Sequence, residues 1–156
     1  MRILGIDPGT GILGFGVIDT KNRNPVCVDA GVITTPAKTP DSERLHTIYH
    51  DLNQIIKDTK PDVIAVEKLF FSQNVTTAMS VAQARGIVLL LGKMHGLELH
   101  EFTPQQIKQA MTGYGKATKQ QIQEMVRLQL KLKETPKPDD AADALACAIT
   151  CSMNMR

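Results

Sequence analysis

The sequence predicts an α/β protein with a five-stranded mixed sheet, in which three antiparallel strands are followed by two further strands and helices flank the sheet. Two observations support this fold class. Residues 1–35 contain three β-rich segments separated by turn residues, which predicts consecutive antiparallel strands. Two later β-rich segments, 63–66 and 97–102, each follow a helix-length segment, as in proteins that pack helices against a sheet. The length of 156 residues suits one domain, 1–156, with a core that needs no disulfide.

The first strand is an apolar run that ends at Asp7. Ile3 and Ile6 favour a buried strand, and Pro8 ends it because proline has no N–H for the ladder. A carboxylate at the C-terminal end of a central strand stands where open α/β sheets keep their chemistry. The alternative is that Asp7 only starts the turn that Gly9 continues.

Two further segments complete the antiparallel part of the sheet. Residues 12–19 alternate apolar side chains with glycines, a period of two that predicts a strand hairpinned to the first. Val26 to Thr35 is also β-rich and follows a polar segment, 21–25, whose asparagines and proline favour a turn.

A helix and a fourth strand follow. From Asp41 to Lys60 the apolar residues recur at helical spacing, and Pro61 ends the pattern. Val63 to Val66 is a short apolar strand, and Glu67 follows it as Asp7 follows the first strand.

The next helix is unusually apolar. Residues 75–95 predict a long helix whose segment 86–91 is apolar on every side. Such a helix must be covered on more than its sheet-facing side, either by another subunit or by neighbouring elements of the same chain. Leu97 to Phe102 is the fifth strand.

Three helices complete the chain. Thr103 opens the first of them as an N-cap, and Gly113 ends it. Thr118 caps the second, which is expected to run to about Leu132. The last helix, Asp139 to Met153, is rich in alanine and carries acids in its first turn, as a helix N-terminus favours.

Composition indicates an ordinary globular chain. Hydrophobic residues make up 42% and charged residues 22%, and no run of 18 apolar residues predicts a membrane span. The N-terminal segment does not have the pattern of a signal peptide, so we expect a cytoplasmic protein. Three cysteines without a C-x-x-C pair fit a reducing compartment.

Charge is unevenly distributed along the chain. Seven basic and two acidic residues lie between Pro104 and Pro138, so this stretch carries +5 and the remainder −3, against a net charge of +2. The stretch is either an electrostatic footprint for a polyanion or a pair of solvated helices.

Three glycines after the first strand, at positions 9, 11 and 14, match a dinucleotide-binding fingerprint. That fingerprint must open a helix, whereas residues 12–19 alternate like a strand, so we reject nucleotide binding. We interpret these glycines as a bare hairpin beside Asp7, where a bulky side chain would obstruct a phosphate backbone.

Four carboxylates form the candidate catalytic group: Asp7, Glu67, Asp140 and Asp143. Asp140 and Asp143 lie three apart on one helix and share a face, and Asp139 is the rival of Asp140. Converging carboxylates raise one another's pKa unless cations neutralise them, and an all-oxygen shell selects Mg²⁺ or Mn²⁺. Such a site suits two-metal phosphodiester hydrolysis. Alternatively, the acids of the last helix only serve its dipole.

Four sequence blocks, in order along the chain, resemble the signature of the RuvC family, the bacterial Holliday-junction resolvases. The blocks are Leu4-Gly5-Ile6-Asp7-Pro8-Gly9-Thr10, Ala65-Val66-Glu67, Gln83-Ala84-Arg85-Gly86 and Asp140-Ala141-Ala142-Asp143-Ala144-Leu145-Ala146. The resemblance implies an RNase H-like fold, a homodimer and Mg²⁺-dependent symmetric nicking of four-way DNA junctions in recombination and repair. It also implies the branch-migration motor proteins RuvA and RuvB as partners, and no membrane.

The resemblance also implies roles for individual residues. Catalysis and metal binding are expected of Asp7, Glu67, Asp140 and Asp143, with two Mg²⁺ ions per site and Mn²⁺ as a substitute. The family's D-A-A-D spacing favours Asp140 over Asp139 as the ligand.

Five DNA contacts are implied in the same way: Phe70, Lys108, Lys116, Lys119 and Arg127. Phe70 matches an aromatic that stacks on unpaired bases, Lys108 and Lys119 match basic residues near the cleaved strand, and the other two would add phosphate contacts. Phe71 has no counterpart that we can place. The long apolar helix, 75–95, resembles the family's dimer element. Two other functions stay open: a ribonuclease of the same fold that cuts RNA–DNA hybrids, and a relative that binds nucleic acid without catalysis.

Overall fold

The computed structural model describes residues 1–68 and 75–155. Its centre is a five-stranded sheet with the strand order β3-β2-β1-β4-β5. The strands are β1 (Arg2–Asp7), β2 (Ile12–Asp19), β3 (Val26–Thr34), β4 (Val63–Glu67) and β5 (Glu98–Phe102). The helices are α1 (Asp41–Thr59), α2 (Val75–Met94), α3 (Pro104–Thr112), α4 (Lys119–Gln129) and α5 (Asp139–Asn154), with a short 3₁₀ helix at Lys21–Arg23.

The predicted fold class is confirmed, and the strand pairing adds what the sequence left unstated. β2 pairs antiparallel with both β1 and β3, whereas β4 pairs parallel with β1 and β5 pairs parallel with β4. β1 is therefore the central strand. The carboxyl ends of β1, β4 and β5 meet at one edge of the sheet, where Asp7 and Glu67 are the last strand residues.

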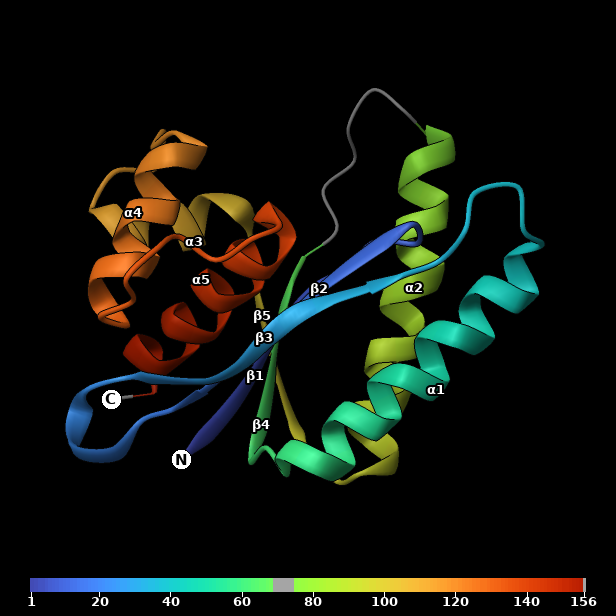
Figure 1. Cartoon of the computed structure of the whole chain (residues 1–156), viewed down its shortest axis with the longest axis horizontal. Coiled ribbons are helices and arrows are strands. Elements are labelled where there is room, and N and C mark those ends of the chain that lie inside the picture. The colour runs from blue at the N-terminus through green and yellow to red at the C-terminus, as the bar shows by residue number, and fades with distance from the viewer. Residues whose placement is uncertain (69–74, 156) are drawn as a thin grey trace.

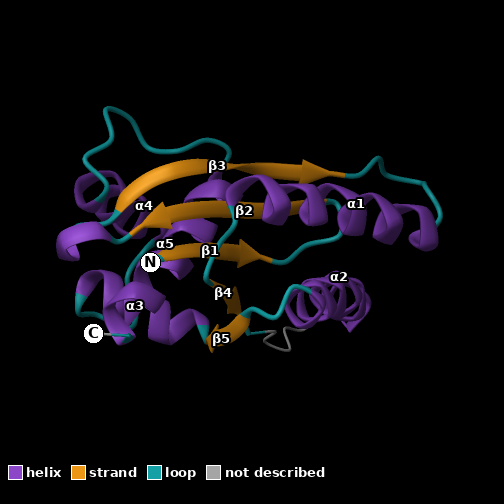
Figure 2. Cartoon of the chain, turned by 90° about the horizontal axis from the view of Figure 1, so that it is seen from below, coloured by secondary structure: helices purple, strands orange, loops and turns teal. Residues whose placement is uncertain are grey.

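Helices cover both faces of the sheet (Figure 1). One buried cluster joins the sheet to α3, α4 and α5, and includes Ile3, Val126 and Leu145. A second cluster joins the opposite face to α1 and α2, and includes Leu4 and Val88. The view from below shows the same three layers, with the sheet in the middle (Figure 2). Alternate residues of β1 thus enter different cores, as a strand buried on both faces requires.

Glycines let α5 approach the sheet very closely. A Cβ built on Gly5 would lie 2.1 Å from the Ala144 carbonyl oxygen, and one on Gly14 would lie 2.0 Å from the Asp140 carbonyl oxygen. On Gly16 it would lie 2.6 Å from Leu145 Cγ. The small side chains of α5, mostly alanines, complete this contact.

Packing within the chain gives a further reason for the glycine-rich hairpin. Gly14 faces the backbone of α5, and a Cβ on Gly9 would lie 2.2 Å from the Ile12 carbonyl oxygen inside the turn. These contacts require glycine at both positions, and the passage of a phosphate backbone beside the hairpin stays a prediction.

One predicted helix end was wrong. The fourth helix was expected to reach about Leu132, but α4 ends at Gln129. The N–H of Leu130 bonds to the Val126 and Leu128 carbonyls, and Lys131 has a φ of 53°, in the left-handed region. A residue in that conformation cannot continue a right-handed helix. The apolar spacing continued beyond the end because Leu130 still packs into the core.

Among the residues that the structure describes, the apolar helix α2 is covered on one side only. Ala84, Val88 and Leu91 are buried, whereas Met79 and Leu90 are exposed. Of the described helices, α2 alone is long and apolar enough to span a membrane, with a mean hydropathy of 1.4. This departs from the expectation that no segment would qualify, but a core helix of a soluble protein satisfies the same test. It is weak evidence for a membrane.

Candidate active site

Asp7 and Glu67 lie side by side because of the parallel pairing of β1 and β4. Ile6 stands opposite Val66 in the register, and each carboxylate is the next residue of its strand. Both side chains are only partly accessible. The two strand-end acids predicted from the sequence are thus neighbours at one edge of the sheet.

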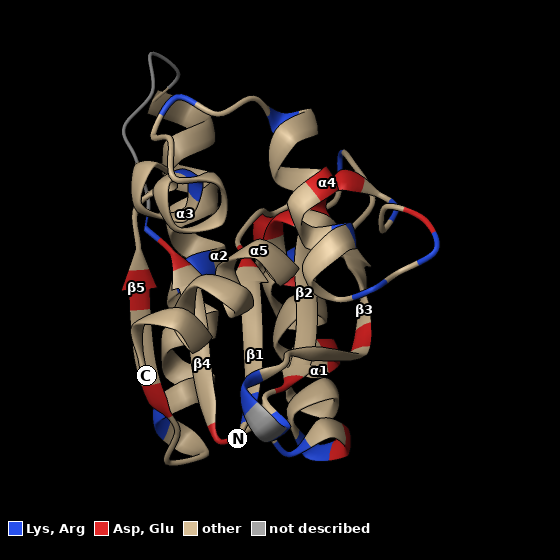
Figure 3. Ribbon diagram, turned by 90° about the vertical axis from the view of Figure 1, so that its left-hand side faces the viewer, with Lys and Arg blue, Asp and Glu red and all other residues tan. Residues whose placement is uncertain are grey.

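The first turn of α5 brings two further acids to this edge. Gly14 is the β2 partner of Asp7, and the backbone of Asp140 lies directly on Gly14. Asp143 follows one turn later on the same side and lines the cleft that Glu67 also lines. Figure 3 shows these acidic segments where β1 and β4 end and α5 begins.

Electrostatic interactions link Asp7 to the other three acids. Burial raises the pKa of Asp7 to about 8, with further contributions from Glu67, Asp143 and Asp140. Burial and then Asp143 raise the pKa of Glu67. Buried carboxylates that repel one another favour protonation unless a cation is bound.

Asp139 and Asp140 differ in their effect on Asp7. Both charges act on Asp143 and Lys119, but Asp140 alone of the two is among the groups that raise the pKa of Asp7. The backbone of Asp140 also lies on Gly14, the β2 partner of Asp7. These observations favour Asp140, and the choice of ligand stays a prediction.

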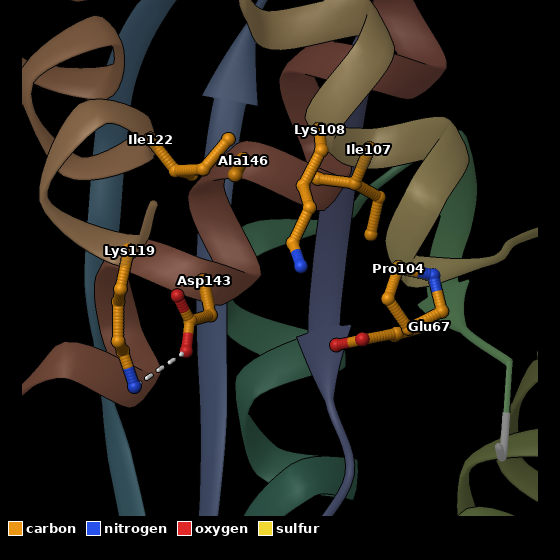
Figure 4. A pocket seen from close by; sticks show the side chains of 8 residues that line it. All are labelled: Glu67, Pro104, Ile107, Lys108, Lys119, Ile122, Asp143 and Ala146. Atoms are coloured by element: carbon orange, nitrogen blue, oxygen red, sulfur yellow. Dashed lines mark ion pairs between the residues drawn. The ribbon is translucent and has the colours of Figure 1, made fainter. Parts of the chain in front are cut away.

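Glu67 and Asp143 line a cleft of about 290 Å³, and two lysines, Lys108 and Lys119, extend into it from α3 and α4 (Figure 4). The lysines are placed by predicted capping boxes, in which Thr103 pairs with Gln106 and Thr118 with Gln121. Lys119 is the first residue of α4, directly after its cap.

Both lysines act on the carboxylates. Lys119 Nζ lies 3.4 Å from an Asp143 oxygen and 3.8 Å from an Asp139 oxygen. Burial works to lower the pKa of Lys119, but Asp143 and the neighbouring acids outweigh it and raise that pKa. Burial raises the pKa of Glu67, and the charge of Lys108 partly opposes that rise. The cleft therefore offers both oxygen ligands and ammonium groups to a ligand.

The donor set fits a hard divalent cation, because all four candidate ligands are carboxylates. In residues 1–68 and 75–155, no group of three or more Asp, Glu, His or Cys side chains is arranged so that it could hold a metal ion, so the fit is one of donor chemistry. Burial, and after it the charges of the neighbouring acids, raise the pKa of Asp7 to about 8, and a bound cation would offset both effects by stabilising the ionised carboxylate.

The other residues predicted to contact DNA differ in how accessible they are in the structure. Lys116 is exposed in the loop between α3 and α4. Arg127 is held by Glu124, with nitrogen–oxygen distances of 2.6 and 2.9 Å, so in this structure its guanidinium serves an intrahelical pair. Phe70 and Phe71 lie outside the described residues. The contributions of these side chains to DNA binding stay predictions.

Sequence reasoning missed the residues that set the depth of this site. Gly5 and Gly16 admit α5 to the sheet, and Pro104, Ile107 and Ile122 form the apolar walls of the cleft. The signal for Gly16 was present, since glycines alternate with apolar residues in β2, but alternation cannot tell which element will cover them. Gly5 lies in β1, where no such alternation marks it.

The family model described as "Crossover junction endodeoxyribonuclease RuvC" matches residues 3–151. The chain belongs to the RuvC family. Proteins named crossover junction endodeoxyribonuclease RuvC include one from Heliobacterium modesticaldum, 52% identical over 99% of this chain and 96% of its own length. Another, from Desulfitobacterium hafniense, is 56% identical over 96% of this chain and 90% of its own.

A solved structure agrees. T. thermophilus RuvC in complex with a Holliday junction substrate superposes with a TM-score of 0.95 at 36% identity, covering 100% of this chain and 95% of that one. The RNase H-like fold implied by the sequence blocks is thereby shown. As a member of the RuvC family, the chain is a nuclease.

Proposed function

We propose that the chain resolves four-way (Holliday) junctions in DNA recombination and repair by paired symmetric nicks. The observation that carries this proposal is the meeting of Asp7, Glu67, Asp140 and Asp143 at one sheet edge, beside two lysines. The T. thermophilus relative bound to a Holliday junction supports junction DNA as the substrate.

The four carboxylates are the proposed ligands of Mg²⁺, two ions per site, with Mn²⁺ as a substitute. When bound, the ions supply an activated water and charge stabilisation for phosphodiester hydrolysis. The chain's own contribution is to fix the acids on rigid elements: two on adjacent strands and two on one helix face. Such placement keeps the ligands in position before the substrate arrives.

The lysines are proposed to act on the DNA. Lys108 and Lys119 point into the cleft towards the carboxylates, so a phosphate entering the site meets ammonium groups on its α3 and α4 side (Figure 4). Positive charge at that place attracts the scissile phosphate and stabilises the negative charge that develops on it. Lys116 lies on the path between these two helices and would add a contact outside the cleft.

The exposed face of α2 is proposed to bind a second copy of the chain. Val75, Met79, Leu90 and Met94 are large, apolar and exposed, and they share one face of the helix with Gly86. A Cβ at Gly86 would meet nothing within 4 Å, so a partner helix can approach there. Two active sites related by a two-fold axis suit paired, symmetric nicks. RuvA and RuvB as partners and a cytoplasmic location stay predictions.

A nicking assay tests the proposal. Wild-type protein, with and without Mg²⁺, is given a four-way junction, the matching linear duplex and an RNA–DNA hybrid, and the products are resolved by strand. We expect Mg²⁺-dependent nicks at symmetric positions on the junction alone. Cleavage of the hybrid in preference to the junction would assign the chain to the ribonuclease alternative. Junction binding without nicks in Mg²⁺ or Mn²⁺ would assign it to the non-catalytic one.

A further inference from the structure

A second cleft, of about 360 Å³, lies beside the turn that joins β1 to β2, on the α1 and α2 side of the sheet. Its walls come from that turn, from α1 and from the first turns of α2. Arg44 is the charged side chain among the described lining residues, and Thr76 and Thr77 contribute hydroxyl groups. The Thr10 hydroxyl donates to the Ser80 carbonyl at 2.7 Å and is also hydrogen-bonded to the Ser80 hydroxyl, so these two groups are already engaged. The cleft thus has a guanidinium in a largely apolar wall, and none of the predicted functions uses it.

Hydrogen bonds hold Arg44 in place. Its Nε donates to Thr35 Oγ1 at 2.8 Å, and the Thr35 hydroxyl in turn donates to the Thr10 carbonyl at 2.6 Å. The N–H of Thr35 donates to the Gly11 carbonyl at 2.9 Å. Arg44 Nη2 lies against Gly11, where a Cβ would be 3.2 Å away. The guanidinium is therefore fixed on the turn before any ligand arrives.

The terminal nitrogens of Arg44 are not neutralised within the described part of the chain. Arg2, Arg85 and Arg127 each pair with a carboxylate, whereas no ion pair of the described residues includes Arg44. The acids in the first turn of α1, Asp41 and Glu43, are exposed. An oriented guanidinium with two open nitrogens matches the fork of oxygens on a phosphate.

We propose that this cleft is a phosphate subsite that binds a backbone phosphodiester group of the junction DNA. The proposal rests on the proposed function, because its ligand is the DNA of that reaction. The turn that follows Asp7 supplies Gly9, Thr10 and Gly11 to the cleft, so one short segment of chain joins the subsite to the carboxylates.

Arg44→Gln tests the charge of the subsite. Binding of a four-way junction is measured in EDTA, which prevents cleavage, over a series of salt concentrations. Loss of one phosphate contact lowers the slope of log K against log salt by about 0.9, and Arg44→Lys should restore most of it. Lys57→Gln, an equal charge change in the last turn of the same helix, should leave the slope unchanged. Equal slopes for Arg44→Gln and wild type would overturn the proposal.

A scan of neutral phosphates tests the position of the contact. Single methylphosphonates are placed along the strand on both sides of the cut, and binding is compared between wild type and Arg44→Gln. We expect one position at which neutralisation weakens wild-type binding but has no further effect on the variant. Thermal unfolding of each variant checks that the fold is kept. Additive losses at every position would overturn the proposal even if Arg44→Gln were less stable.

A free anion could use the same chemistry, so inorganic phosphate is titrated in parallel and followed by the shift in unfolding temperature. If Arg44→Gln abolishes a phosphate-induced rise while the methylphosphonate scan is unchanged, the cleft takes a small anion and the DNA assignment is wrong. The scan is run on whichever DNA the chain binds in EDTA. A protein that fails to nick junctions in Mg²⁺ therefore refutes the proposed function without deciding the subsite, which the scan decides separately.

Discussion

Asp140 and Asp139 are adjacent acids with different expected roles. Asp140 is among the charges that raise the pKa of Asp7, whereas Asp139 pairs at 3.8 Å with Lys119 at the rim of the cleft. Asp140→Asn should therefore reduce junction nicking below detection while binding in EDTA is kept. Asp139→Asn should retain nicking within a few-fold, since an exposed ion pair contributes little.

Strand-specific nicking assays and junction binding, run on both variants at the same Mg²⁺ concentration, measure this difference. The two substitutions are matched in type and differ by one position. An active Asp140→Asn enzyme would contradict the ligand assignment, and equal loss in both variants would show that the first turn of α5 acts as a unit.

Asp7 makes the metal-free protein sensitive to pH. Its pKa of about 8 lies far above the ordinary value of 3.8, so between these values the folded chain holds a proton that the unfolded chain has lost. The stability associated with this proton is present below about pH 4 and is lost as the pH rises towards 8. In EDTA, the free energy of unfolding should fall between these pH values in the wild type. The fall should be larger than that in Asp7→Asn by an amount on the order of a few kcal/mol.

Urea unfolding at a series of pH values measures this effect. Mg²⁺ should reduce the loss in the wild type, because a bound cation stabilises the ionised acid. Identical pH profiles for wild type and Asp7→Asn would show that Asp7 is not the group that titrates.

At the scale of elements, α5 can pack closely on β1 and β2 only because both strands have glycines, without side chains, where the helix crosses them. Gly14→Ala places a Cβ 2.0 Å from the Asp140 carbonyl oxygen, so α5 must shift. We expect a loss of about 1 to 3 kcal/mol in unfolding free energy, as in overpacked cores. Nicking should fall further than this loss predicts, since the shift moves Asp140 and Asp143 relative to Asp7.

Gly92→Ala is the matched control for this prediction. A Cβ there would make ordinary contacts of 3.5 Å with Ile64 and Leu99, and a helix interior favours alanine over glycine. Its stability should be unchanged or raised and its nicking normal. Chemical unfolding and the Mg²⁺ dependence of nicking are measured on both variants. If Gly14→Ala kept the Mg²⁺ dependence of the wild type, Gly14 would not have the positioning role that we assign to it.

The elements were largely predictable because the local signals are strong. Capping boxes at Thr103 and Thr118 gave the starts of α3 and α4, and the period-two pattern gave β2. The end of α4 was not predictable from apolar spacing, since Leu130 packs into the core from outside the helix. The packing of α5 on the sheet could not be predicted either, because no local sequence pattern indicates which helix will contact Gly14.

At the scale of the whole molecule, the acids could be listed from the sequence, but their meeting depends on long-range topology. Glu67 lies beside Asp7 because β4 pairs in parallel with β1. The residues alone did not show that the four acids converge, and the resemblance to RuvC sequences supplied that expectation. The Arg44 cleft was not foreseen. Its walls lie at positions 9–12, 44 and 76–81, and no motif links them.

The uncovered face of α2 leads to a prediction about assembly. Leu90 and Met94 expose large apolar surfaces, which monomers seldom leave open when several lie on one helix face. Leu90→Glu introduces a charge that dimer formation would bury without a partner, so the variant should sediment as a monomer at concentrations where the wild type is dimeric. Each monomer keeps its own four acids, and single nicks should persist.

Paired nicking separates an assembly defect from a folding defect. On a junction held in a supercoiled plasmid, two nicks within one binding event linearise the DNA, whereas independent nicks first give an open circle. Leu90→Glu should therefore accumulate open circles, while Val26→Glu, an exposed apolar residue on the edge strand β3, should linearise the plasmid as wild type does. A dimeric Leu90→Glu protein that still pairs its nicks would show that α2 is not the interface, and would direct attention to β3.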